Sequence, residues 1–131
     1  MEDNFKLEII SPEKIIFSDD AKIVTIPSYE GDMSILKNHI SIITFLRPGI
    51  IKVQKKEGNI NDFFVQDGTV EYFNNNLIVL SASAMNIKDL SKEFVDNLNK
   101  DTQEKLADKN ITDHDCYILN HKLNVLKEVR I

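Results

Sequence analysis

One histidine and two nearby carboxylates are the residues of this sequence best suited to chemistry. Glu30 and Asp32 flank Gly31 in a turn-like stretch, and His39 follows a short distance along the chain. An imidazole paired with a carboxylate can act as a general acid or base, so an enzyme using His39 with Asp32 or Glu30 is one interpretation. The other is a non-catalytic residue in an adaptor, either hydrogen-bonded internally or touching a partner. The residues alone favour this second interpretation.

A second group of chemically capable side chains lies near the C-terminus and comprises His114, Cys116 and His121. On a helix, His114 and His121 share a face but lie two turns, about 10.5 Å, apart along the axis. Cys116 points to a different face. These residues therefore cannot form the local four-ligand set that zinc prefers, and we expect no metal site.

The glycines are dispersed in separate turns, so they form no glycine-rich phosphate loop, and no cofactor is expected. Gly31 is expected to be a turn residue with a positive φ angle, which glycine adopts without steric cost. Pro48 and Gly49 are expected to form a type II turn, in which proline occupies the second position and glycine the third.

The composition excludes several classes of protein. The 131 residues include 21 acidic and 16 basic side chains, which gives a formal net charge of −5. No nucleic acid partner is expected, because binding a phosphate backbone requires a basic face. The single cysteine permits no internal disulfide. No stretch approaches the roughly 20 apolar residues of a membrane-spanning helix, so we expect no direct membrane insertion.

Up to about residue 84, apolar and polar residues alternate in short runs. In the first run Phe5, Leu7 and Ile9 alternate with charged residues, and turn residues separate this run from the next. Short alternating runs of this kind predict antiparallel strands with one buried face. Residues 1–85 are therefore expected to form an N-terminal antiparallel β-sandwich domain.

Some of these runs carry apolar residues on both faces, as at Ile42 and Ile43. Successive side chains of a strand point to opposite faces, so only one of these two isoleucines can enter the core. The other adds to an apolar outer surface, and a surface of that kind is expected to meet a partner.

The second part of the chain has a helical period. Leu90, Phe94 and Leu98 recur every four residues, which predicts one amphipathic helix. Thr112 with Asp115 three residues later resembles a capping box and marks the start of a second helix. A short loop between two such helices predicts an antiparallel hairpin.

Residues 86–131 are therefore expected to form a C-terminal two-helix hairpin domain, and the fold class is α+β. The segment 97–110 is dense in polar residues and offers few core contacts. A hairpin of this composition is marginal by itself. We expect it to pack weakly on the sandwich or to exchange between docked and extended positions.

Taken in order, these features resemble the epsilon subunits of F-type ATP synthases, which are called delta in mitochondria. The resemblance covers nearly the whole chain. No single landmark is specific, but the ordered set and its spacing are. The landmarks are Ser11-Pro12-Glu13, Phe17-Ser18, Glu30-Gly31-Asp32, His39, Pro48-Gly49, the stretch "FVQDGTVEYFNNNLIVLSASA" and the change to helix near residue 85.

The resemblance implies a non-catalytic subunit of the central stalk, or rotor, in a proton- or sodium-driven ATP synthase. The sandwich would link the gamma subunit to the c-ring, and the hairpin would reach the catalytic alpha/beta head and restrain ATP hydrolysis. Glu30, Gly31, Asp32 and His39 match the segment that meets the c-ring loops. A peripheral position on the cytoplasmic face of the bacterial inner membrane follows from the same resemblance.

The apolar outer face of the sandwich is the expected contact with the gamma subunit, and one of Ile42 and Ile43 is expected to take part in it. Charging the outward isoleucine should weaken gamma binding, whereas charging the inward one should unfold the sandwich.

A nucleotide site is not expected. Some members of the family bind ATP through the motif Ile/Leu-Asp-x-x-Arg-Ala, but the matching stretch here is Leu90–Val95, which lacks the aspartate, arginine and alanine. An arginine expected in the second helix is replaced by Asn124. Lys92 is a possible substitute, and the hairpin's single arginine, Arg130, is next to the C-terminus.

Overall fold

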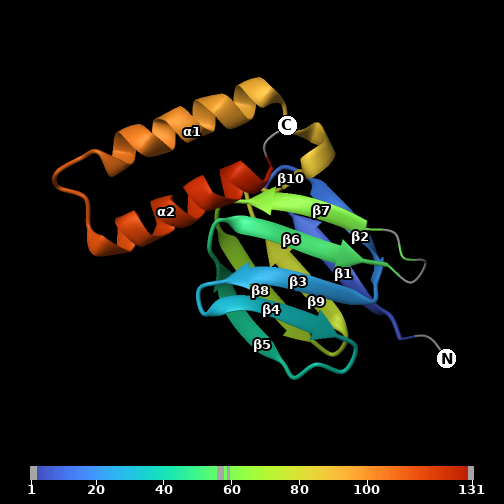
Figure 1. The fold of residues 1–131 in the computed structure, drawn as a ribbon. Coiled ribbons are helices and arrows are strands. Elements are labelled where there is room, and N and C mark those ends of the chain that lie inside the picture. The colour runs from blue at the N-terminus through green and yellow to red at the C-terminus, as the bar shows by residue number, and fades with distance from the viewer. Residues whose placement is uncertain (1–2, 56–57, 59, 130–131) are drawn as a thin grey trace.

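The computed structural model describes residues 3–55, 58 and 60–129, and it confirms the predicted sandwich followed by a helical hairpin (Figure 1). The strands are β1 Phe5–Ile10, β2 Ile15–Ala21, β3 Ile23–Ser28, β4 Gly31–Leu36, β5 Ile42–Leu46, β6 Gly49–Gln54, β7 Ile60–Val65, β8 Gly68–Phe73, β9 Asn76–Leu80 and β10 Met85–Asn86. The helical segments are the 3-10 turn η1 Ile87–Asp89 and the helices α1 Lys92–Leu106 and α2 Asp113–Glu128.

The strands form one hydrogen-bonded sheet that folds over on itself. Its order is β10-β7-β6-β3-β5-β8-β9-β1-β2, with β4 paired to the other side of β3. The two layers join where β3 meets β5, through the single pair Ser28 and Leu46. The pairing is antiparallel except between β1 and β9, which run parallel. The alternating pattern of the sequence does not distinguish a parallel from an antiparallel neighbour, so it did not predict this pair.

The inward positions of the strands fill the main core. Phe5, Leu7 and Ile9 of β1 are all buried, as the alternation predicts, and they join buried residues from both layers. Fully burying a side chain of this size stabilises the fold by about 1.5–3 kcal/mol. Tyr72 and Phe63 are the largest fully buried side chains in this cluster.

Both helices begin at a residue whose side chain caps the helix. Ser91 Oγ accepts a hydrogen bond from the Phe94 amide at 3.0 Å before α1, and Thr112 Oγ1 accepts one from the Asp115 amide at 3.0 Å before α2. Each cap satisfies a backbone donor that has no partner inside the helix. The Thr112 cap is the one predicted from the sequence, whereas the Ser91 cap is additional.

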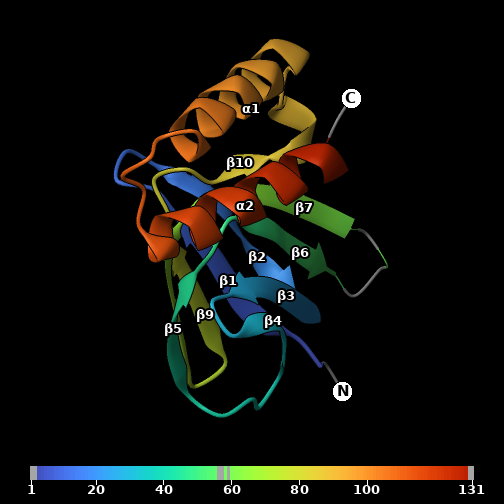
Figure 2. The same ribbon diagram turned by 60° about the vertical axis from the view of Figure 1, so that its left-hand side comes forward.

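The hairpin is docked on the sandwich. Figures 1 and 2 both show α2 between α1 and the sheet, and α2 packs against β6. A second cluster of buried residues fills the junction and is made of Phe64, Leu90, Val95, Val125, Leu126 and Val129. Phe64 is fully buried there even though it points away from the main core. Of the two positions expected for the hairpin, docked and extended, the structure shows the docked one.

Two local features refine the expectations drawn from the sequence. Gly31 has a φ angle of +123°, as predicted for a turn glycine. The prediction of a type II turn at Pro48–Gly49 is wrong, because Gly49 is the first residue of β6 and does not have a positive φ angle. Glycine is required there by space, since a Cβ atom would lie 2.4 Å from Pro27 Cβ. The strand β10 crosses the expected domain boundary at 85/86 and pairs with β7.

Candidate functional site

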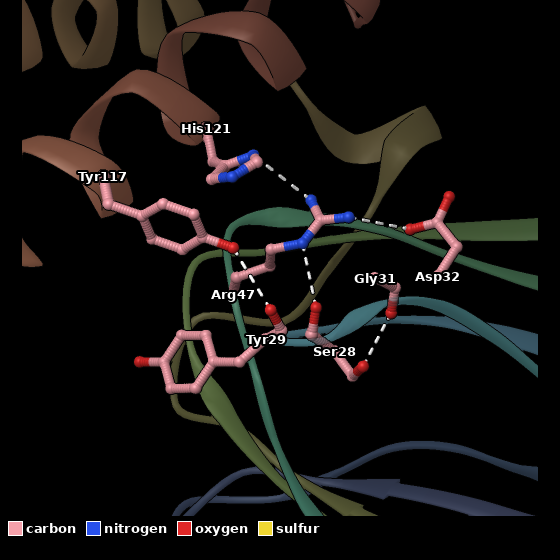
Figure 3. A network of polar contacts seen from close by, with 7 residues as sticks. All are labelled: Ser28, Tyr29, Gly31, Asp32, Arg47, Tyr117 and His121. Carbon is pink, nitrogen blue, oxygen red and sulfur yellow. Dashed lines mark hydrogen bonds and ion pairs between the residues drawn. The ribbon is translucent and has the colours of Figure 1, made fainter.

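Arg47 organises the polar junction between the sandwich and the hairpin (Figure 3). It lies between β5 and β6, and its side chain is only 16% exposed. Its Nε donates to the Ser28 carbonyl at 2.9 Å, and its Nη2 donates to Asp32 Oδ1 at 3.1 Å. Its Nη1 lies 3.4 Å from Nδ1 of His121 on α2. One guanidinium therefore joins β3, β4 and the second helix.

The contact between Arg47 and His121 defines the state of the imidazole. Arginine has donors and no acceptor, so Nδ1 of His121 must be the acceptor and carry no proton. The histidine is then neutral, with its proton on Nε2. Burial and the nearby Arg47 charge both lower the pKa of His121 below its ordinary value, which favours this neutral form.

A tyrosine makes the second polar contact across the junction. Tyr117 Oη on α2 donates to the Tyr29 carbonyl at 3.2 Å. The Tyr117 ring also packs edge-on against the His121 ring, with centroids 4.4 Å apart. The Tyr29 ring lies 6.1 Å from the His114 ring and 6.5 Å from the Phe45 ring. The start of α2 is thus held against the turn between β3 and β4.

A polar cavity of about 260 Å³ lies beside this network, between α2 and the sandwich. The cations Arg47 and Lys52 line it together with the carboxylates Asp32 and Glu128, and Asn124 faces it from α2. Equal numbers of positive and negative side chains give the cavity no preference for a triphosphate. Lys92 is exposed at the start of α1, and Arg130 lies outside the described residues.

The structure separates the residues that the sequence suggested as one site. Asp32 is at the start of β4, beside Arg47 and the hairpin. His39 follows the other end of the strand, where its amide donates to the Leu36 carbonyl and its Nδ1 donates to the Ile40 carbonyl at 2.7 Å. With a rise of about 3.3 Å per residue, β4 places Asp32 and Leu36 roughly 13 Å apart.

This separation does not favour the alternative enzyme interpretation. His39 is not paired with Asp32 or with Glu30, which lies in the exposed turn before β4. Its ring packs 5.8 Å from the Tyr72 ring, and its Nδ1 is already bonded to a main-chain carbonyl. His39 is therefore a half-buried, hydrogen-bonded residue at a strand end. The structure therefore does not place the Asp32 carboxylate beside His39.

The outer face of the sandwich carries the apolar surface that the sequence predicted. Ile43 is 77% exposed, whereas Ile42 packs against the main core. Strand pairing places Ile43 and Phe45 of β5 on the same face as the half-buried Ile78 and the exposed Leu80 of β9, with the polar Glu71 and Thr69 of β8 between them. Phe45 and Leu80 also line an open hollow of about 580 Å³. Ile43 is thus the outward member of the predicted pair.

No cluster of three or more potential metal ligands occurs among the described residues. In the same part of the chain, no helix is long and apolar enough to cross a membrane.

Comparison with known proteins identifies the class to which this fold belongs. Residues 4–87 match the family "ATP synthase, Delta/Epsilon chain, beta-sandwich domain". The chain is 47% identical over 128 residues to the ATP synthase epsilon chain of Pelagibacter ubique. The alignment covers 97% of this chain and 98% of that protein. It is 32% identical over 109 residues to the ATP synthase epsilon chain of Clostridium botulinum, and the alignment covers 83% of this chain and 82% of that protein. The chain belongs to the epsilon chain family of ATP synthases.

Solved structures show the same fold at low sequence identity. A chain of the Euglena gracilis mitochondrial ATP synthase structure, described as OSCP/F1/c-ring, matches with a TM-score of 0.79 and 17% identity, covering 98% of this chain and 82% of that one. A chain of the Tetrahymena thermophila central stalk and c-ring structure matches with a TM-score of 0.60 and 14% identity, covering 96% of each.

Analysis of the sequence missed the Arg47 network. Arg47 and His121 are separated by 74 positions, and no local pattern connects them. The only sequence signal was an arginine at the end of an apolar run, directly before Pro48. That signal shows a charged residue next to the core but does not identify its partner.

Proposed function

We propose that this chain is a non-catalytic subunit of the central stalk in a proton- or sodium-driven F-type ATP synthase. Its sandwich would link the gamma subunit to the c-ring, so that ion-driven rotation of the ring reaches the catalytic head. Membership in the epsilon chain family supports this role, and so do the central-stalk and c-ring assemblies in which the structural neighbours occur. The protein would lie peripherally at the cytoplasmic face of the bacterial inner membrane.

The exposed apolar residues of β5 and β9 are the observation on which the proposal depends. Ile43, Phe45 and Leu80 are each more than half exposed, and the register of the strands places them on one surface. Large apolar side chains exposed together on one surface indicate a protein interface. The gamma subunit is the partner that the family suggests, and its contact would bury Ile43.

The c-ring contact would consist of two separate parts. His39 and the 77% exposed Ile40 lie between β4 and β5, whereas Glu30 lies in the turn between β3 and β4, and Gly31 and Asp32 begin β4. Asp32 remains 69% exposed despite its ion pair with Arg47, so it can still meet a cation on a ring loop. An exposed ion pair of this kind contributes only about 0–1 kcal/mol.

The hairpin would act on the catalytic alpha/beta head and restrain ATP hydrolysis. Its separate buried cluster supports this idea, because α1 and α2 join the sandwich without contributing to the main core. Such an arrangement allows the hairpin to leave the sandwich while the sandwich stays folded.

Affinity purification from membranes tests the proposal. A tagged chain expressed in a strain that lacks its own epsilon subunit should retain the gamma and c subunits after mild detergent extraction. The Ile43→Asp variant should lose gamma, while Lys22→Asp, at an exposed position outside this face, should retain it. Recovery of neither subunit with the parent chain would reject the rotor assignment.

A further inference from the structure

Among the residues that the structure describes, His121 is a titratable group whose two charge states make opposite contacts at the junction between hairpin and sandwich. Arg47 donates from Nη1 to its Nδ1 at 3.4 Å, and only a neutral imidazole can accept that bond. Protonation would remove the acceptor and place an imidazolium beside a guanidinium. Both groups are at the docking surface of α2, so the change acts on the docked position itself (Figure 3).

We infer that His121 makes hairpin docking pH-sensitive: the neutral imidazole holds α2 on Arg47, and the imidazolium is repelled from it. This inference concerns the chain by itself and does not depend on its role in a rotor. It adds a regulatory group to the junction that neither the family membership nor the sequence motifs provide.

The other charges around His121 do not reverse this effect. Asp32 on β4 faces the same cavity, but its carboxylate is already bonded to Arg47 at 3.1 Å. Lys52 on β6 adds a second cation to the cavity wall. Glu128 on α2 is two helical turns, about 10.5 Å, along the axis from His121. Arg47 is therefore the formal charge in direct contact with the imidazole.

The remaining contacts of His121 come from its own helix. The Tyr117 and His121 rings make a T-shaped contact, with centroids 4.4 Å apart and an angle of 71° between their planes. An aromatic ring attracts a cation most strongly over its face. That attraction would favour the imidazolium, but the Arg47 guanidinium carries a full charge and opposes it. Burial also opposes the charged form, because it removes the water that would solvate it.

The direction of the pH dependence follows from these contacts. The docked state holds the pKa of His121 below its ordinary value of 6.5, through burial and Arg47. Docking is then fully favoured above that ordinary value, where His121 is neutral in both states. It weakens as the pH falls toward the lower pKa of the docked state, because the undocked hairpin binds the proton more readily.

Energy transfer between two dyes measures docking directly. In a Cys116→Ser background, cysteines at the exposed positions Lys22 and Glu104 carry the dyes, one on the sandwich and one on α1. We expect transfer to fall between about pH 7.5 and about pH 5.5, with the ratio of docked to undocked molecules decreasing at least about threefold. His121→Gln should abolish this response and remain docked, since a glutamine oxygen can accept the Arg47 bond at either pH.

The matched control is His114→Gln, which replaces the other histidine of α2 near the sandwich and should leave the pH response intact. His121→Lys, a permanent cation, should show low transfer at pH 7.5. Circular dichroism verifies that the His121→Lys protein is folded. If this variant does not fold, the pH response of His121→Gln alone tests the inference. An equal pH response in the parent and in His121→Gln, or no response in the parent, would overturn the inference.

Discussion

Tyr117 Oη donates to the main-chain carbonyl of Tyr29 at 3.2 Å, which ties the start of α2 to the turn between β3 and β4. The Tyr117 side chain is partly exposed, so water competes for this bond. Its net contribution is therefore in the usual range of about 0.5–1.5 kcal/mol. The bond matters because few other polar contacts cross this junction.

Replacing Tyr117 by phenylalanine should weaken docking by about 1 kcal/mol, because the ring stays and only the donor is lost. Hydrogen exchange of the α2 amides should become several-fold faster, while exchange in β6 stays unchanged. Tyr29→Phe is the matched control, since Tyr29 takes part through its carbonyl, which the substitution keeps. Similar exchange rates in both variants would show that the hydroxyl does not hold the helix.

Ile42 and Ile43 should respond oppositely to a charge. Ile43→Asp should leave the sandwich folded, because the side chain is 77% exposed, and should weaken gamma binding by tenfold or more, about 1.4 kcal/mol. Ile42→Asp should destabilise the fold by about 2 kcal/mol or more, because the carboxylate enters the core. Urea unfolding and calorimetric titration with the gamma subunit give the two quantities. Normal gamma binding by a folded Ile43→Asp protein would exclude this strand from the contact.

The two proposed c-ring contacts should act independently. His39 and Asp32 are at opposite ends of β4, and distant sites normally have additive effects. His39→Ala and Asp32→Ala should each reduce proton pumping per ATP hydrolysed in membrane vesicles, and the double variant should show the product of the two effects. Asp32→Ala should also loosen the hairpin, because it removes a partner of Arg47. Unchanged pumping in the double variant would leave the ring assignment without support.

ATP should bind the isolated subunit more weakly than about 1 mM, equivalent to less than roughly 4 kcal/mol of binding free energy. Triphosphate binding requires convergent cationic donors, and the cavity beside α2 pairs Arg47 and Lys52 with Asp32 and Glu128. Calorimetric titration with magnesium-ATP measures the affinity. A saturable micromolar isotherm would contradict this prediction, and loss of that isotherm in Lys92→Ala or Lys52→Ala would locate the site.

Removing the residues after Lys88 should leave a folded sandwich that still binds gamma. The main core contains no residue of α1 or α2, so its packing survives the truncation. Phe64, however, loses the cover that the hairpin provides and becomes an exposed apolar residue on β7. We expect a cooperative urea transition together with increased aggregation. Phe64→Thr in the truncated chain should restore solubility, and a truncated chain without a cooperative transition would show that the hairpin is needed for folding.

Local patterns in the sequence predicted much of the architecture. Alternation over short runs identified the strands and the inward side of β1, because adjacent side chains of a strand always face opposite ways. The recurrence of Leu90, Phe94 and Leu98 predicted α1, although Leu90 itself lies before the helix, at the end of η1. Thr112 marked the start of α2 through a bond that spans only three residues. Each of these features depends on neighbours in the chain, so the sequence alone contains the necessary information.

The tertiary structure alone decided which distant residues meet. It selected Ile43 over Ile42 as the outward residue, paired β1 with β9 in parallel, and separated His39 from Asp32. It also brought Arg47 to His121 across 74 positions of the chain. Such contacts depend on how whole helices and strands pack, and on which hydrogen-bond acceptors lie within reach of buried donors. A periodic pattern defines which face of an element is buried but not which partner covers it. For this reason only the tertiary structure reveals the contacts between the hairpin and the sandwich.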